Sequence, residues 1–275
     1  MLKRLFLLLP LFLLVACTTL PTPDMRREYA IDLAAKKGWQ VETLPAGPFD
    51  LAAFFPVSFQ LHDLLTVYIE GDGFAWLDRS TPSSDPTPVD PLGLRLALLH
   101  PGGNAAYLAR PCQYVGAEQM ECASRYWMEA RFAPEVITAT NQAVDALKSH
   151  FGAHHLQLVG YSGGGAIAEL VAVRRDDVVR IITVAGNLDP RAWAAYHHLS
   201  PLTGSLDPVD YIDSLKQIPQ WHFVGKEDEI VPPELAEAFS KRFPPLQQPV
   251  VKIVPSYDHH CCWVENWARL IGNLP

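Results

Sequence analysis

The chain has 275 residues, of which 49% are hydrophobic and 19% charged, and its formal net charge is −8. This length is enough for one large domain with a full hydrophobic core, and the composition excludes a largely disordered chain. Nucleic-acid binding fits poorly as well, because the chain is acidic and has no long basic run that could neutralise phosphates.

Residues 1–16 are typical of an export signal. Lys3 and Arg4 form a positive start, and the apolar stretch 5–16 that follows is shorter than the about 20 residues needed to span a bilayer. It ends in Leu14-Val15-Ala16-Cys17, which resembles the lipobox of bacterial lipoproteins. This resemblance implies acylation of Cys17 and anchoring in the bacterial cell envelope, facing the periplasm, and Thr18 favours the outer membrane. The alternative is an ordinary cleaved signal with an incidental cysteine.

Export makes disulfides the expected state of the other four cysteines, since an oxidising compartment favours them over thiol catalysis. We expect Cys112 to pair with Cys122 across a short loop. Cys261 and Cys262 would then be left to each other, in a strained bridge, because adjacent Cα atoms are only about 3.8 Å apart. Pairing of Cys112 with one of these two is the alternative. Neither cysteine pair has zinc-ligand spacing, so we do not expect them to bind zinc. The acyl-transfer reaction inferred below needs no metal and no cofactor.

Three segments follow from the element pattern: a signal peptide at 1–16, a lipidated N-terminus, tether and helix at 17–38, and one α/β domain at 39–275. Asp24 is expected to cap a helix that ends before Gly38. In the domain, early strands follow one another closely and later ones alternate with helices, which predicts a sheet that is antiparallel at its start and parallel afterwards. The expected strands are Trp39–Leu44, Phe49–Phe55, Leu65–Glu70, Asn104–Arg110, Leu156–Gly160, Val179–Ala185, Trp221–Gly225 and Val250–Val254, and the expected helices are Pro91–Leu99, Pro134–Phe151, Gly164–Arg174, Pro233–Arg242 and Trp263–Ile271.

Ser162 is the candidate nucleophile. The apolar strand 156–160 leads directly into Gly160-Tyr161-Ser162-Gly163-Gly164, which fits the G-x-S-x-G pattern, and a helical run follows at once. Such a turn holds the serine in a strained conformation, and its small neighbours let strand and helix approach closely. The Gly163 amide would then point to where an oxyanion forms. The alternative is a glycine-rich turn with an incidental serine.

From about Trp39 to its C-terminus, the chain resembles the α/β-hydrolase superfamily. The resemblance implies a mostly parallel eight-stranded sheet with helices on both faces, a short cap insertion at 187–213, and an acid and a histidine after later strands. Asp228 lies in Gly225-Lys226-Glu227-Asp228-Glu229-Ile230-Val231-Pro232, which is similar to the family's acid turn. Asp189, one strand earlier, is the rival acid.

The base would come from the pair His259-His260 after the last strand. His259 fits the family's spacing better, and His260 is the alternative. The second oxyanion donor would be the backbone amide of Asp72 or Gly73, where relatives often have His-Gly. We expect the carboxylates of Glu70 and Asp72 to point away, because a negative charge beside an oxyanion opposes catalysis.

Together these residues predict acyl transfer to water through Ser162, His259 and Asp228. Carboxylesters are the first substrate class, thioesters the second and peptides the third, so the expected partners are a small acyl substrate and, through the N-terminal lipid, a membrane. A lipid-anchored binding protein on an inactive hydrolase fold is the competing hypothesis. Residues 110–114 and Tyr126-Trp127 also resemble segments of uncharacterised bacterial α/β-hydrolase lipoproteins. Substrate identity and oligomeric state do not follow from the sequence.

Overall fold

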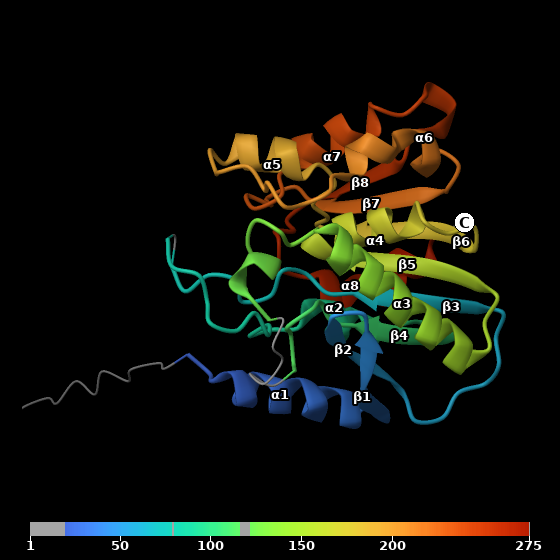
Figure 1. Ribbon diagram of the computed structural model, residues 1–275. Helices are drawn as coiled ribbons and strands as arrows, with labels where there is room; N and C mark the ends of the chain where they lie inside the picture. Colours follow the sequence, from blue (N-terminus) through green and yellow to red (C-terminus); the bar gives the residue numbers. More distant parts are fainter. Residues whose placement is uncertain (1–19, 79, 116–121, 275) are drawn as a thin grey trace, which may run out of the picture.

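The computed structural model describes residues 20–78, 80–115 and 122–274 (Figure 1). The expected signal peptide and the lipidation site at Cys17 lie outside these residues. Among the helices of the described ranges, none is long and apolar enough to cross a membrane.

One eight-stranded sheet forms the centre of the molecule, in the order β1-β2-β4-β3-β5-β6-β7-β8. Strand β2 is antiparallel to both of its neighbours, β1 and β4, and all the other neighbouring strands are parallel. The predicted change from antiparallel to parallel pairing is therefore confirmed, and every expected strand is present within two residues at either end. The strands are β1 (Trp39–Ala46), β2 (Phe49–Pro56), β3 (Leu64–Ile69), β4 (Asn104–Leu108), β5 (His155–Tyr161), β6 (Val178–Val184), β7 (Gln220–Gly225) and β8 (Val250–Val254).

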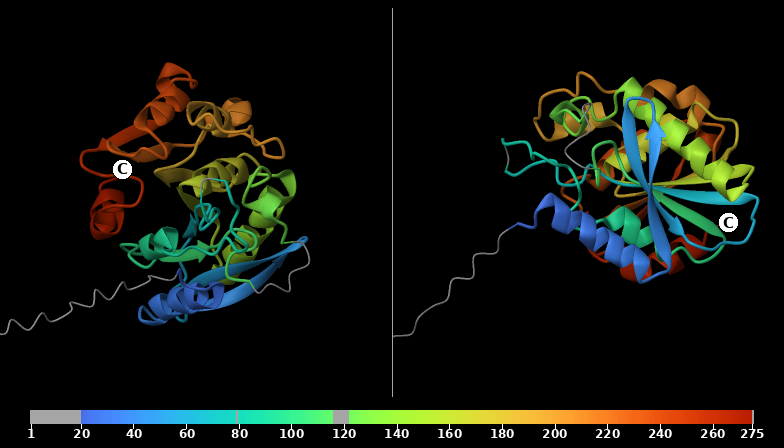
Figure 2. Two further views of the ribbon diagram at one scale, coloured as in Figure 1. Left: turned by 90° about the vertical axis from the view of Figure 1, so that its left-hand side faces the viewer. Right: turned by 60° about the horizontal axis from the view of Figure 1, so that its bottom comes forward.

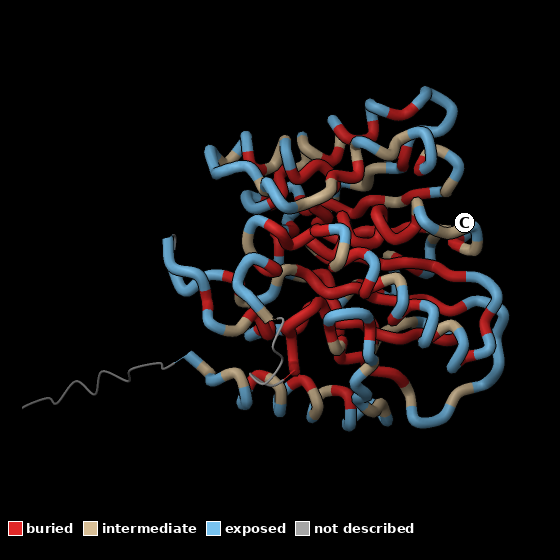
Figure 3. The backbone as a smooth tube through the Cα atoms, in the orientation of Figure 1, coloured by how far each residue is buried: buried red, intermediate tan, exposed pale blue. Residues whose placement is uncertain are grey.

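Helices cover both faces of this sheet, and each face has its own hydrophobic core (Figures 1 and 2). One core joins the sheet to α3, α4 and α7, and the other joins it to α1, α2 and α8. Buried residues concentrate along the strands and in α4, whereas exposed residues recur along the other long helices (Figure 3). The helices are α1 (Pro23–Ala35), α2 (Leu92–Ala97), α3 (Pro134–Phe151), α4 (Gly163–Ala172), α5 (Pro190–Tyr196), α6 (Ile212–Leu215), α7 (Pro233–Ser240) and α8 (Trp263–Gly272).

Helix α1 begins two residues earlier than the sequence suggested. Its N-cap is Thr22, whose Oγ1 accepts a hydrogen bond from the amide of Met25 at 3.3 Å, and Pro23 occupies the first helical position. The prediction of Asp24 as the N-cap is wrong. Proline fits the first turn because its missing N–H would have no partner there, so Asp24 becomes a first-turn acid next to the positive end of the helix.

Cys112 is bonded to Cys122, with Cα atoms 5.4 Å apart, and Cys261 is bonded to Cys262. This is the local pairing expected from the sequence. The first bridge packs beside Trp127 in a small cluster of its own, and the second directly precedes α8.

The parallel strands end together at the left of Figure 1. Six segments that follow strands therefore meet at one edge of the sheet: those after β3, β4, β5, β6, β7 and β8. The insertion 187–213 lies there too, as the short helix α5 and a turn of 3-10 helix at Pro208–Tyr211. Ligand sites in open α/β sheets form at this carboxyl edge.

Candidate active site

Ser162 lies in the sharp turn between β5 and α4. Its backbone has φ 51° and ψ −122°, a conformation that side-chain-bearing residues rarely adopt. Strand and helix come so close here that a Cβ on Gly160 would lie 2.3 Å from the Gly164 carbonyl oxygen. A Cβ on Gly164 would lie 2.3 Å from the carbonyl oxygen of Ile69. The glycines of the motif are therefore required by close packing.

Ser162, His259 and Asp228 form one chain of hydrogen bonds. The Ser162 Oγ lies 3.0 Å from His259 Nε2, and His259 Nδ1 lies 2.9 Å from Asp228 Oδ2. The other carboxylate oxygen, Asp228 Oδ1, accepts hydrogen bonds from the amides of Ile230 (2.9 Å) and Val231 (2.7 Å). The histidine and the aspartate are buried and the serine is partly exposed. A serine hydroxyl, an imidazole and a carboxylate are therefore joined in one hydrogen-bonded line, an arrangement that can activate a hydroxyl as a nucleophile.

The rival residues are placed elsewhere. Asp189 caps α5 by accepting a hydrogen bond from the Ala192 amide at 2.9 Å, and its second oxygen pairs with Arg242 at 2.9 Å. The exposed ring of His260 packs edge-on against His259, with ring centroids 5.0 Å apart. The structure thus brings together the first-choice residues of the sequence analysis, and the alternatives lie outside the hydrogen-bonded chain.

The backbone matches many solved structures, although no family model and no curated protein matches the chain. Est1E of Butyrivibrio proteoclasticus is 16% identical, with a TM-score of 0.57 over 84% of this chain and 95% of that one. An esterase of Pyrococcus furiosus is 13% identical, with a TM-score of 0.58 over 85% and 88% of the two chains. An α/β serine hydrolase homologue of Coxiella burnetii is 17% identical, with a TM-score of 0.56 over 86% and 97%. The chain has the α/β-hydrolase fold.

The start of α4 and the loop after β3 lie next to each other beside Ser162 and form the candidate oxyanion site. Gly163 is the first residue of α4, where helix geometry leaves an amide without a partner in the helix. In the facing loop, the Gly71 amide is taken by Glu70 Oε1 at 2.9 Å, so the amides of Asp72 and Gly73 remain the candidates for the second donor. Gly73 has φ +67°, and a Cβ there would lie 2.0 Å from a backbone carbonyl oxygen.

The Asp72 carboxylate lies beside the oxyanion site, so the expectation that it points away is wrong. A Cβ built on Gly163 would lie only 2.2 Å from Asp72 Oδ1. Two buried arginines make this position tolerable: Arg110 Nη1 lies 3.1 Å from Oδ1 and Arg131 Nη1 lies 2.5 Å from Oδ2. Burial raises the pKa of Asp72, but the two guanidinium groups outweigh it and leave the pKa below its ordinary value. The cluster carries one net positive charge.

Glu70 also faces the cleft and is buried. Its Oε1 accepts hydrogen bonds from the amides of Gly71 (2.9 Å) and Gly93 (3.2 Å), and its Oε2 lies 3.0 Å from the Tyr107 hydroxyl. Burial raises the pKa of Glu70 to about 7, and these hydrogen bonds offset only part of the rise. The carboxyl therefore changes its protonation state near neutral pH.

Sequence reasoning missed both arginines of this cluster. Arg110 directly follows β4, the neighbour of β3, so its place at the carboxyl edge could have been inferred from the strand order. Arg131 comes from the irregular segment before α3 and carried no such signal.

A cleft of about 450 Å³ opens over Ser162. His259, Arg131 and Asp72 are among its polar lining residues, and aromatic and aliphatic side chains form much of the rest of its lining. The apolar lining residues are Phe74, Ala75, Trp76, Pro88, Val89, Trp193 and Ile230. Such a site suits a substrate with an apolar body and one polar reacting centre.

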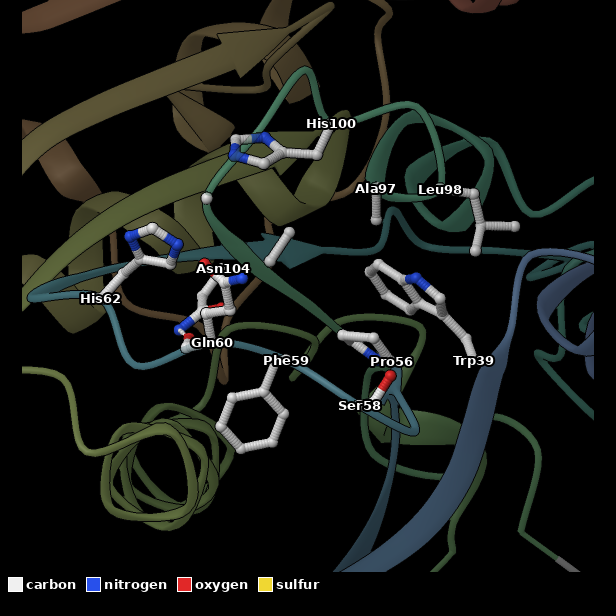
Figure 4. Close-up of a pocket in the computed structure, with 12 residues that line it drawn as sticks. Trp39, Pro56, Ser58, Phe59, Gln60, His62, Ala97, Leu98, His100 and Asn104 are labelled. Atoms are coloured by element: carbon white, nitrogen blue, oxygen red, sulfur yellow. Dashed lines mark hydrogen bonds between the residues drawn. The ribbon is translucent and has the colours of Figure 1, made fainter.

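A larger cavity, of about 600 Å³, lies near the opposite ends of the strands (Figure 4). Trp39 and Leu98 line one side of it and His62 and Asn104 the other. The half-buried His100 in its lining is hydrogen-bonded to the hydroxyl of Tyr68 at 2.9 Å, and its partial burial lowers the pKa of this histidine to about 4. Because Ser162 and its partners lie at the other end of the sheet, this cavity is no part of the hydrogen-bonded site. In the part of the chain that the structure describes, no cluster of His, Cys, Asp and Glu could hold a metal ion.

Proposed function

We propose that this protein is a serine hydrolase that cleaves an acyl bond through an acyl-enzyme on Ser162. The observation that carries the proposal is the continuous chain of hydrogen bonds from Ser162 Oγ through His259 to Asp228, with Ser162 on a strained turn that lines a cleft. A binding protein would not need a nucleophile, a base and an acid in this geometry.

In the proposed reaction His259 Nε2 takes the proton of Ser162 as Oγ attacks the carbonyl carbon. Asp228 accepts the Nδ1–H bond, which fixes the histidine tautomer and stabilises the imidazolium that forms. The Gly163 amide and a second amide from Asp72 or Gly73 stabilise the oxyanion. The net positive charge of the Asp72 cluster acts in the same direction. His259 then protonates the leaving group, and water hydrolyses the acyl-enzyme by the same steps.

Carboxylesters are the substrate class that we propose first, and thioesters second. The apolar walls of the cleft support a substrate whose acyl or alcohol part is apolar. The likeness in fold to Est1E and to the Pyrococcus furiosus esterase also supports an ester substrate, although a fold alone does not determine a reaction.

The test is hydrolysis by the purified protein of matched ester, thioester and aminoacyl-amide substrates, with Ser162→Ala as the control. Ester cleavage that disappears in Ser162→Ala supports the proposal. Faster cleavage of the amide series would make the protein a peptidase. No cleavage of any series by the wild type would favour a binding protein on an inactive fold.

We also propose that Cys17 carries the lipid anchor, on the evidence of the Leu14–Cys17 signal alone. Mass spectrometry of the N-terminal peptide should then find an acylated Cys17. An unmodified mature N-terminus at another residue would refute the anchor and leave the hydrolase proposal intact.

A further inference from the structure

The rim of the active-site cleft is apolar and exposed. Trp76, Val89 and Ile230 line the cleft beside Ser162, yet their side chains are 40%, 39% and 42% exposed. Leu77, next to Trp76 in sequence, is 52% exposed. Large apolar side chains that gather at the mouth of a site mark a surface that contacts something other than water.

Helix α5 adjoins this rim, because its Trp193 also lines the cleft. Trp193 Nε1 donates a hydrogen bond to the Ile230 carbonyl oxygen at 2.7 Å, which ties α5 to the segment that carries Ile230. At the end of α5, Tyr196 and Leu199 are each about half exposed. We call Trp76, Leu77, Val89, Tyr196, Leu199 and Ile230 the cleft rim.

The start of α1 is fixed to the wall of the same cleft. The buried side chain of Arg26 donates a hydrogen bond to the Thr87 carbonyl oxygen, lies 3.6 Å from the Asp85 carboxylate, and stacks 5.1 Å above the ring of Phe74. Phe74 lines the cleft, and Thr87 directly precedes cleft-lining residues 88–90. The chain therefore enters the domain beside the cleft, and Figure 1 shows the N-terminal end of α1, the loop segments 72–78 and 80–90, and the end of α5 on one side of the molecule.

This placement brings the proposed anchor close to the rim. Cys17 precedes the Thr22 cap of α1 by five residues, which an extended chain covers in at most about 18 Å. The described chain between them begins with Leu20, which is 61% exposed. A lipid on Cys17 would hold this side of the molecule against the membrane surface.

We propose that the cleft rim rests on the lipid bilayer and that the substrate is an acyl ester of a membrane lipid, which enters the cleft without crossing water. The inference rests on the proposed hydrolase function and on the proposed anchor at Cys17. These observations favour the bilayer as the surface that covers the rim. Aromatic and aliphatic side chains beside a covalent lipid stabilise the attachment of a protein to a membrane interface. The net charge of −8 argues against an attachment held by attraction to anionic lipids.

Fluorescence quenching tests the contact without depending on activity. The full lipidated chain is placed in phosphatidylcholine vesicles whose acyl chains carry bromine, which quenches tryptophan only at short range. We expect quenching of the wild type and loss of most of it in Trp76→Phe. Trp221→Phe is the matched control, since Trp221 lies near the amino end of β7. An unquenched wild type, or an equal loss in both variants, would overturn the proposal.

Activity on two substrates tests the consequence for catalysis. Leu77→Glu places a charge on the rim outside the residues that line the cleft, and Leu246→Glu places one on a fully exposed leucine before β8. On a long-chain ester dissolved in the vesicles, Leu77→Glu should lower the rate by at least about tenfold, with the rate on a water-soluble short ester unchanged. Leu246→Glu should change neither rate.

The outcomes separate this inference from the proposed function. Equal effects of Leu77→Glu and Leu246→Glu on the vesicle ester would overturn the bilayer inference, as would a wild type that cleaves only the soluble ester. In both cases the hydrolase proposal stands. Quenching at Trp76 without cleavage of either ester would support the bilayer contact and overturn the proposed reaction.

Discussion

Glu70 makes the stability of the protein dependent on pH in a predictable direction. Glu70, at the start of the loop after β3, is only 1% exposed. This burial raises the pKa of its carboxyl from an ordinary 4.5 to about 7. Glu70→Gln keeps the shape of the protonated side chain. The amide oxygen can accept from Gly71 and Gly93, and the amide nitrogen can donate to the Tyr107 hydroxyl. The variant should therefore fold as the wild type does at acidic pH.

The sign follows from the raised pKa. Below pH 4.5 Glu70 is protonated in both the folded and the unfolded state and has no effect on pH dependence. Between 4.5 and 7 the unfolded state releases the proton while the folded state keeps it, so the free energy of unfolding falls as the pH rises. The pKa of Glu70 differs between the unfolded state (4.5) and the folded state (about 7). At about 1.4 kcal/mol for each pKa unit, the free energy of unfolding falls by about 3 kcal/mol once both states have lost the proton.

Urea unfolding followed by tryptophan fluorescence between pH 5 and pH 8 measures this effect. Over that range the wild type should lose about 2 to 3 kcal/mol relative to Glu70→Gln, which lacks the titrating group. Glu234→Gln, at an exposed glutamate on α7, is the matched control and should follow the wild type. A difference between wild type and Glu70→Gln that stays constant with pH would refute the argument that burial controls this carboxyl.

Two further predictions concern the triad. Asp228→Asn should lower the rate of acylation roughly 10³- to 10⁴-fold, because the aspartate no longer fixes the histidine tautomer, whereas Asp189→Asn should leave this rate nearly unchanged. Stopped-flow acylation kinetics distinguish the two variants. A large loss in Asp189→Asn and none in Asp228→Asn would move the acid one strand earlier. His259→Ala should abolish ester hydrolysis and His260→Ala should keep at least about a tenth of it, since only His259 bonds to the serine. Steady-state rates of the two variants check this, and loss of activity in His260→Ala alone would contradict it.

The sequence predicted the sheet and the three residues of the hydrogen-bonded chain because their signals are local. A strand, a glycine-rich turn and a helix are consecutive around Ser162, and the close approach that requires Gly160 is to Gly164, four residues later. The choice of His259 over its neighbour depended on spacing after β8, and the structure places its ring nitrogen 3.0 Å from the serine oxygen.

The charges around the site could not be predicted in the same way. Asp72 pairs with Arg110 and Arg131, which are 38 and 59 residues further along the chain, so no local pattern joins them. An acid beside an oxyanion site is unfavourable by itself, and only the three-dimensional pairing shows why it is tolerated. The N-cap of α1 is Thr22 and not Asp24 for a local reason: Pro23 prefers the first helical position, which makes the residue before it the cap.

Covalent labelling of Ser162 tests the central claim most directly. The full-length wild type is incubated with a fluorophosphonate probe, which reacts with a serine activated by a base, and the modified peptide is sequenced by mass spectrometry. We expect the label on Ser162 and on no other serine, with labelling lost in Ser162→Ala and strongly slowed in Asp228→Asn. An unlabelled wild type, or equal labelling of wild type and Ser162→Ala, would contradict the assignment of Ser162 as the nucleophile.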